Sequence, residues 1–419
     1  MSDKLRLKRT NVATLIGTIL EQHDFIIYAH LLPVVSALCF SPHDLASVTV
    51  QKGFLSFAIG YVFRPLGGLV FGHFGDKFGR KGALIVSISL MSIPTFLIGV
   101  LPGYAQIGVA SGLILYLLRG LQSFSVGGEL SGAGVVVLEN APLHRKYFYA
   151  SVLHGAAFSG GLLGALSGFF FTQPFMPIWA WRMAFILGSM IAFIGFYLRS
   201  KAVETPEFAL VLEQKKVLKS PVIATLKKDW FSHICYVGMV ASSSGVNSYM
   251  IVYTPMIMKT KFGYSVSESL IVTICFYGLI LSTLPFFGLL ADRIGGKRVI
   301  ATGNFFVALI VPFALRATEF KTPDYFFLFQ ALACVAFAIE CAPLSVITKY
   351  MYPTERRYSG SSFGLGLGAA VVGGFTPLAL SYLQSQTGGF WGPSIFIMFC
   401  QVAALLGLYF APSFLKQEK

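Results

Sequence analysis

The chain has 419 residues, of which 55% are hydrophobic and only 12% are charged, and its mean hydropathy is +0.71. Soluble domains carry about 25% charged residues, so this composition excludes an ordinary water-soluble globule and favours a surface that faces lipid. The net charge of +14 would suit nucleic acid, but the basic residues collect in short loops between apolar segments, which argues against that partner.

Twelve apolar segments follow one another along the chain. Each segment, as a helix that rises about 1.5 Å per residue, can cross roughly 30 Å of hydrocarbon, although the shorter segments need some flanking residues to do so. The sequence therefore predicts an all-α membrane protein with twelve spans, at residues 12–38, 52–74, 83–101, 107–137, 148–172, 182–198, 232–258, 268–291, 299–315, 325–347, 359–383 and 393–411.

Lys and Arg are distributed unevenly between the two sides of these spans. Of the 32 basic residues, 24 lie at the chain ends and in every second loop, six lie in the remaining loops, and Arg64 and Arg119 fall inside spans. Because cytoplasmic loops carry the excess of Lys and Arg, the pattern predicts that both termini are cytoplasmic. An even number of spans agrees with this orientation.

The chain divides into two halves that repeat each other. We predict a first six-helix half at residues 1–198, a cytoplasmic linker at 199–231 and a second six-helix half at 232–419. The loop GHFGDKFGRK at 72–81 returns as GLLADRIGGK at 288–297, an offset of 216 residues (288 minus 72). Two parallel repeats of six spans predict the major facilitator fold, with a cavity between the halves near the bilayer midplane.

Each copy of this loop carries an Asp among glycines and basic residues. Gly permits a tight turn, Asp can cap a helix N-terminus, and basic side chains can reach acidic groups or helix C-termini. We expect these loops to join the halves on the cytoplasmic side in one conformation and release them in another; the alternative is a turn that only follows the positive-inside rule. The predicted gating residues are Asp76, Arg80, Lys81, Asp292, Lys297, Glu139 and Arg145.

Ionisable residues inside the spans are candidates for function, because each costs at least about 2.5 kcal/mol there. Glu21 and Asp24 lie three residues apart in the first span and share a helix face, where two carboxylates in one cavity repel each other and favour proton uptake. Arg119 is the expected partner of ionised Asp24, and Glu129 lies on the same span as Arg119. We predict proton coupling at these four residues; the alternative is that buried cations simply neutralise the acids.

Arg64, at the middle of the second span, is the predicted anchor for a substrate carboxylate, which a guanidinium binds through two parallel hydrogen bonds. A structural ion pair is the alternative. Other polar and aromatic side chains are expected to line the same cavity, namely Arg119, Gln122, His23, Tyr28, Tyr249 and Tyr253.

The sequence shows no phosphate-binding loop, metal-ligand cluster or nucleophile elbow. We therefore expect no enzymatic activity, no cofactor and no metal site. The expected partners are a small-molecule solute, protons and membrane lipid, with no nucleic acid, and the protein is expected to function as a monomer.

Together the motifs resemble the metabolite:proton symporters of the major facilitator superfamily. The matching segments are RPLGG at 64–68, the loop at 72–81, QSFSVGGE at 122–129, ETPEF at 204–208 and residues 352–360, while residues 91–99 look most like the proline/betaine branch. The resemblance implies proton-coupled import of a small carboxylate-bearing solute, such as proline, betaine or an organic acid, across a bacterial inner membrane by alternating access. The first span reads EQHDF at 21–25 where the family has Glu-Trp-Tyr-Asp-Phe, so both acids are kept and two aromatics are replaced.

Two other classes of function remain open. A proton-independent facilitator or exchanger of metabolites would share the fold and work without a proton gradient. A membrane sensor or scaffold would need a sizeable soluble output domain, and the sequence shows none.

Overall fold

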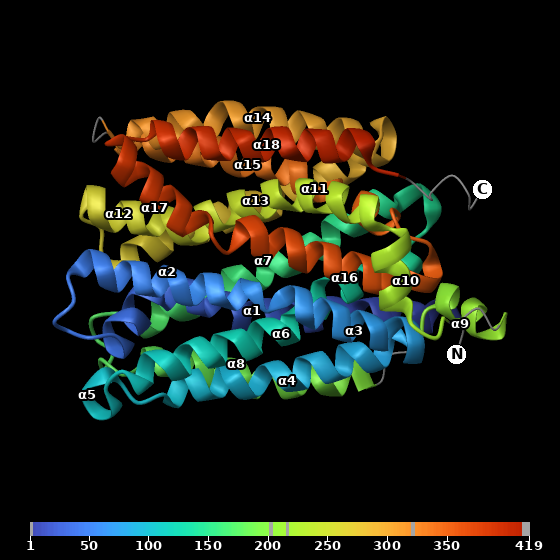
Figure 1. Ribbon diagram of the computed structural model, residues 1–419, viewed down its shortest axis with the longest axis horizontal. Helices are drawn as coiled ribbons and strands as arrows, with labels where there is room; N and C mark the ends of the chain where they lie inside the picture. The colour runs from blue at the N-terminus through green and yellow to red at the C-terminus, as the bar shows by residue number, and fades with distance from the viewer. Residues whose placement is uncertain (1–2, 201–203, 215–217, 320–322, 413–419) are drawn as a thin grey trace.

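The structure is a computed structural model that describes residues 3–200, 204–214, 218–319 and 323–412. Throughout these ranges the regular structure is helical and includes no strand. Long helices run side by side along the longest axis of the molecule (Figure 1). The prediction of an all-α protein is confirmed.

The first half contains six spans. Phe63 interrupts the second of them, so that α2 and α3 together cross the molecule. The helices are α1 (Asp3–Cys39), α2 (Ala46–Val62), α3 (Arg64–Phe78), α4 (Arg80–Val100), the short α5 (Tyr104–Ile107), α6 (Ala110–Glu139), α7 (Lys146–Phe171) and α8 (Trp181–Ser200), with the single turn η1 (Leu143–Arg145) before α7.

The second half also contains six spans, two of which are interrupted by a π-helical turn, η2 (Tyr249–Tyr253) and η4 (Ala369–Gly373). A proline follows each turn closely and removes a main-chain hydrogen-bond donor, and π-helical turns are rare outside functional sites. The helices are α11 (Trp230–Ser248), α12 (Thr254–Phe262), α13 (Val266–Ile294), α14 (Gly296–Ala317), α15 (Pro323–Lys349), α16 (Arg357–Gly368), α17 (Thr376–Thr387) and α18 (Trp391–Phe410), with η3 (Thr354–Arg356) before α16.

The linker predicted at 199–231 carries two short helices, α9 (Pro206–Glu213) and α10 (Pro221–Lys228). Its residues 201–203 and 215–217 lie outside the described part of the chain. In Figure 1 the start of α1, the end of α18 and both linker helices lie at the same end of the bundle. We call this the linker end, and the other the opposite end.

Nine helical segments of the described ranges are long and apolar enough to cross a membrane. The three other long segments are α1, α8 and the continuous run of α11, η2 and α12. Together they make the twelve predicted spans, in the predicted order. The first span differs in length, because α1 begins at Asp3 and extends beyond the membrane-crossing stretch.

The two largest apolar cores centre on different halves, although the first also takes in Ile251 and Leu270 of the second half. The halves also approach each other closely near the linker end. Phe25, Leu115 and Phe185 are buried in one core, and Val311 and Phe326 in the other. Between the halves, glycines remove side chains from the contact. A Cβ on Gly68 or on Gly72 would lie 2.6 Å from the main chain of α16, closer than real Cβ atoms come. The packing of α3 against α16 therefore depends on glycine.

Candidate transport site and gate

A cavity of about 130 Å³ lies between the two halves. Helices α1, α2, α3, α6 and α7 line it from the first half, and α11, α13, α15 and α16 from the second. Its polar lining includes Gln22, Arg64, His154, Asn247, Ser345 and Lys349, and its aromatic lining is Tyr61, Phe158, Tyr236, Tyr277 and Phe337. Among the described residues, no Asp or Glu lines this cavity.

Arg64 is the first residue of α3, at the point where the second span is interrupted. Its guanidinium carbon lies 4.0 Å from the ring centre of Tyr61 and 4.3 Å from that of Phe25. Aromatic faces attract a cation without using its N–H donors, and the buried Nε of Arg64 has no hydrogen-bond partner within the described ranges. The guanidinium is therefore held in place with donors left for a ligand.

Arg119 is completely buried in the first half. Its Nη1 donates to the side-chain oxygen of Gln122, and its guanidinium carbon lies 4.1 Å from the ring centre of Tyr28. The Nε2 of Gln122 donates to the main-chain oxygen of Asp24 at 3.0 Å and to Oγ1 of Thr95 at 2.9 Å. These contacts tie α6 to α1 and α4 inside one half.

The carboxylate of Asp24 faces α8, because a Cβ built on Gly188 would collide with its Oδ1. His23 Nδ1 lies 2.9 Å from this oxygen, and His23 Nε2 lies 3.1 Å from the hydroxyl of Ser167. When Asp24 is ionised, Nδ1 carries the proton and donates. Asp24 is thus paired with a titratable neighbour on its own helix.

Glu21 and Glu129 are also buried in the first half. Both carboxylate oxygens of Glu21 are buried, and no described group hydrogen-bonds to them. Glu129 accepts a hydrogen bond from the hydroxyl of Ser87 on α4. Burying a polar group without a hydrogen-bond partner is costly, which marks Glu21 as a candidate for function.

At the linker end, the residues predicted as two Asp-centred loops form the last turns of α3 and α13, and their Asp side chains make the same contact in opposite directions. Asp76 of the first half accepts from the main-chain N–H groups of Tyr358, at 3.3 Å, and Ser359, at 2.7 Å, at the start of α16. Asp292 of the second half accepts from those of Tyr147, at 3.0 Å, and Phe148, at 3.2 Å, at the start of α7. A helix N-terminus is a favourable site for an anion, so each half anchors a carboxylate of the other. We call this pair of contacts the latch.

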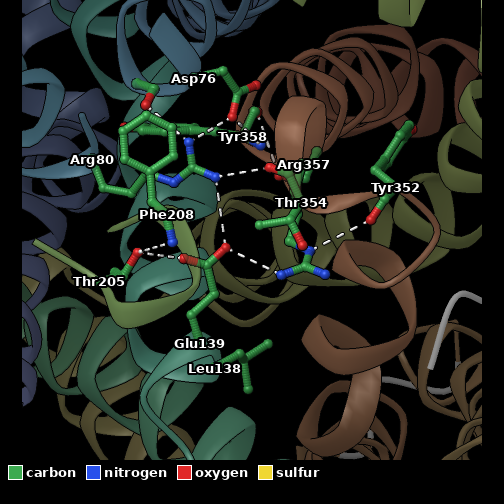
Figure 2. A network of polar contacts seen from close by, with 12 residues as sticks. Asp76, Arg80, Leu138, Glu139, Thr205, Phe208, Tyr352, Thr354, Arg357 and Tyr358 are labelled. Atoms are coloured by element: carbon green, nitrogen blue, oxygen red, sulfur yellow. Dashed lines mark hydrogen bonds and ion pairs between the residues drawn. The ribbon is translucent and has the colours of Figure 1, made fainter. Parts of the chain in front are cut away.

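Arg80 and Glu139 extend the latch into a buried network that Figure 2 shows in detail. Arg80 donates to Asp76 at 2.7 Å and to the main-chain oxygen of Thr354, in the second half, at 3.0 Å. Glu139 lies 3.6 Å from Arg80 and accepts from Arg357 of the second half at 3.1 Å. Two cations and two acids thus neutralise each other across the boundary between the halves.

The linker takes part in the same network. Thr205 donates to Glu139 at 2.7 Å, and the ring centre of Phe208 lies 4.2 Å from the guanidinium carbon of Arg80 (Figure 2). Asp229, which immediately precedes α11, pairs with Arg356 at 3.0 Å. The linker therefore stabilises the closed arrangement at this end.

The opposite end is hollowed. A second cavity of about 510 Å³ lies there between the end of α1, the start of α2, η2, α12 and the start of α13. The molecule is therefore closed between its halves at the linker end and more open at the opposite end.

Comparisons with known proteins agree with this architecture. The family model described as "Sugar (and other) transporter" matches residues 10–232, and that described as "Major Facilitator Superfamily" matches residues 235–419. A putative proline/betaine transporter of Staphylococcus aureus (strain COL) is 32% identical over 421 aligned residues, which cover 98% of this chain and 89% of the relative. The chain belongs to the major facilitator superfamily.

Other relatives support the same assignment. The ectoine/proline transporter ProP of Corynebacterium glutamicum is 28% identical over 95% of this chain and 82% of its own. The inner membrane metabolite transport protein YhjE of Escherichia coli is 31% identical over 90% of this chain and 88% of its own. The solved structure of the proton:xylose symporter XylE bound to 6-bromo-6-deoxy-D-glucose superposes with a TM-score of 0.79 at 16% identity and covers 98% of this chain and 97% of its own. This similarity shows that the two proteins share a fold. The protein is a multi-pass major facilitator transporter of the bacterial inner membrane, and not an enzyme.

The predicted ion pair between Arg119 and Asp24 is wrong for this major facilitator structure, because Arg119 bonds Gln122 and Asp24 bonds His23. The expectation that Glu21 and Asp24 face the cavity is also wrong, since α1 contributes Gln22 and Ile26 to the lining instead. Their part in proton coupling stays a prediction.

Of the predicted substrate-binding residues, Arg64 lines the central cavity. The others are engaged within their own halves, as when Tyr249 donates to Gln330 and Tyr253 to Gln384, each at 2.7 Å. Those placed outside the lining are Arg119, Gln122, His23, Tyr28, Tyr249 and Tyr253. Their role in binding stays a prediction.

Of the predicted gating residues, Asp76, Arg80, Glu139 and Asp292 make contacts between the halves. Arg145 ends the single turn η1, directly before α7, and its role stays a prediction. Lys297 instead donates to Ala411 of its own half at 3.3 Å, and Lys81 uses its main-chain N–H to contact Glu204 at 3.4 Å.

Lys349 is the cavity residue that the sequence prediction placed wrongly. We counted it with the cytoplasmic loop charges, because the tenth span was expected to end at residue 347. Instead α15 continues to Lys349, which is only 3% exposed and lines the cavity. The helical spacing of Cys341, Ser345 and Lys349, four residues apart on one face, was the signal that could have revealed it.

Proposed function

We propose that this protein is a proton-coupled symporter that imports a small carboxylate-bearing solute by alternating access. The observation that carries the proposal is the latch: each half holds a carboxylate against a helix N-terminus of the other, below a cavity that both halves line. Contacts of this kind are made when the halves close at one end and break when they part.

The excess of Lys and Arg at the linker end supports a cytoplasmic location for that end and for both termini. In this orientation the structure corresponds to a conformation that is closed towards the cytoplasm. The cavity at the opposite end then provides the approach for solute from outside.

The buried acids of α1 supply the proton step. Asp24 with its His23 partner, and Glu21, to which no described group hydrogen-bonds, lie on α1 beside the cavity-lining residues Gln22 and Ile26. Protonation changes which hydrogen bonds Asp24 can make. A change at this point of α1 is transmitted to Gln22 and Ile26 because they belong to the same helix.

Uptake by purified protein in liposomes tests the proposal. Labelled proline, betaine, 2-oxoglutarate, citrate and shikimate are supplied with an imposed inward proton gradient, with and without a protonophore. We expect accumulation that the protonophore abolishes and that Asp24→Asn loses. Uptake that only equilibrates and ignores the protonophore would instead indicate a facilitator or exchanger.

A further inference from the structure

We propose that the central cavity binds an organic dicarboxylate, with one carboxylate on Arg64 of the first half and the other on Lys349 of the second. This inference rests on the proposed transport function and narrows its substrate class. It also departs from the zwitterions, proline and betaine, that appear in the names of the relatives.

Lys349 is the main observation. Its side chain is 3% exposed, and no acid or hydrogen-bond acceptor of the described residues pairs with its ammonium group. Lysine is almost never fully buried unless it is paired. An unpaired ammonium that lines a cavity is therefore a site that awaits an anion.

The charges of the lining point to two negative groups. The basic side chains of the lining are Arg64, Lys349 and His154, and the described lining contains no carboxylate that would neutralise them. His154 lies 3.2 Å from the main-chain oxygen of Ala150, which accepts from its Nδ1 and leaves Nε2 without a proton, facing the hydroxyl of Ser345. A dicarboxylate neutralises both cations. A monocarboxylate leaves one cation without a counter-charge, and a zwitterion, which brings a cationic group of its own, leaves two unneutralised cations in a poorly solvated space.

The aromatic face beside Arg64 is not free for the cationic group of a zwitterion. The face of Tyr61, which could receive an ammonium group, already carries the guanidinium of Arg64 at 4.0 Å. Phe158 packs edge-on against Phe337, with ring centres 5.8 Å apart, so these rings contact each other. The polar side chains that remain, such as Asn247 and Ser244, suit the hydroxyl or keto group of a solute better than its ammonium group.

The interval along α6 between the main chain of Arg64 and the end of the Lys349 side chain suits a short dicarboxylate. The main-chain oxygen of Arg64 contacts the position of Gly127 on α6, and the Cε of Lys349 contacts that of Gly134. Seven residues of α helix correspond to roughly 10 Å along the axis. Two carboxylates separated by a few carbons, each reaching a flexible basic side chain, can span this interval.

Such a ligand would connect the halves, because each contributes one cation. Binding would then favour conformations in which Arg64 and Lys349 approach each other, since a ligand shifts an equilibrium towards the state that it contacts better. A solute with a single carboxylate engages one half and lacks this effect.

Binding to purified protein in detergent tests the inference apart from transport. The ligands are succinate and glutarate as dicarboxylates, propionate as a monocarboxylate, and proline and betaine as zwitterions, measured by calorimetry. We expect the dicarboxylates to bind most tightly. Lys349→Met should weaken succinate binding about tenfold or more, the effect expected for losing a buried hydrogen bond to a charged group.

The controls separate charge from folding. Lys349→Arg should retain most of the affinity, and Lys261→Met, which alters an exposed lysine, should retain all of it. Thermal unfolding of each variant shows whether it is folded. The inference is refuted if proline or betaine binds more tightly than the dicarboxylates, or if folded Lys349→Met binds succinate as well as the unmodified protein does.

Failure of the inference is distinguishable from failure of the proposed function. Proton-driven uptake of betaine without dicarboxylate binding would refute only the dicarboxylate site. Dicarboxylate binding with uptake that ignores the protonophore would refute only the proton coupling.

Discussion

Substitution of Asp76 by Asn measures what the latch contributes to closure. Its ion pair with Arg80 lies within the first half, so the pair persists when the halves part. The hydrogen bonds from the main chain of Tyr358 and Ser359 exist only when the halves meet. Removing the charge from these two bonds should destabilise the closed form by about 2 kcal/mol, within the range for hydrogen bonds to charged groups. That is a roughly 30-fold shift in the ratio of closed to open molecules.

Distances between spin labels on the two halves report this ratio. Gly82 on α4 and Arg298 on α14 are exposed near the linker end, and a Cβ on Gly82 meets nothing within 4 Å. Both become Cys in a background in which the exposed Cys275 is Ser. We expect Asp76→Asn to increase the population of long distances.

The matched control is Asp44→Asn, which removes an ion pair of 2.6 Å with Lys52 at the opposite end. It should leave the distances at the linker end unchanged. If Asp76→Asn leaves the distribution unaltered, or if both variants alter it equally, the latch is not what holds the halves together.

Two further substitutions test the closed contact at the same labels. Gly72→Ala places a Cβ 2.6 Å from the Cα of Ser359, so it should favour the open form and slow uptake. Gly278→Ala, whose Cβ would meet nothing within 4 Å, should do neither, and equal uptake rates in the two variants would contradict the close packing. Phe208→Ala removes the ring that covers the guanidinium of Arg80 and should weaken closure by about 1 kcal/mol. The label distances should shift less than in Asp76→Asn, and no shift at all would mean that the linker does not stabilise closure.

The twelve spans could be predicted because length, hydropathy and the alternation of basic loops are properties of the sequence itself. The equivalent contacts of Asp76 and Asp292 at the boundary between the halves agree with the repeat, since two copies of one motif are expected to make equivalent contacts. The helix that each carboxylate binds was not predictable, because main-chain N–H groups leave no mark on the sequence.

The partners of the buried acids could not be predicted either. The spacing of Glu21 and Asp24 gives a shared helix face but not the neighbour that this face meets. In the structure Gly188 allows the carboxylate of Asp24 to approach α8, while Arg119 donates through Nη1 to Gln122. Such choices depend on how helices rotate against each other, which tertiary packing decides.

Proton movement measured together with solute movement tests the central claim most directly. Liposomes that contain the protein and an internal pH-sensitive dye receive external solute, without any imposed gradient. The account predicts that the interior acidifies as labelled solute enters, and that Asp24→Asn abolishes the acidification. Entry of solute at the full rate with no change of internal pH would contradict symport.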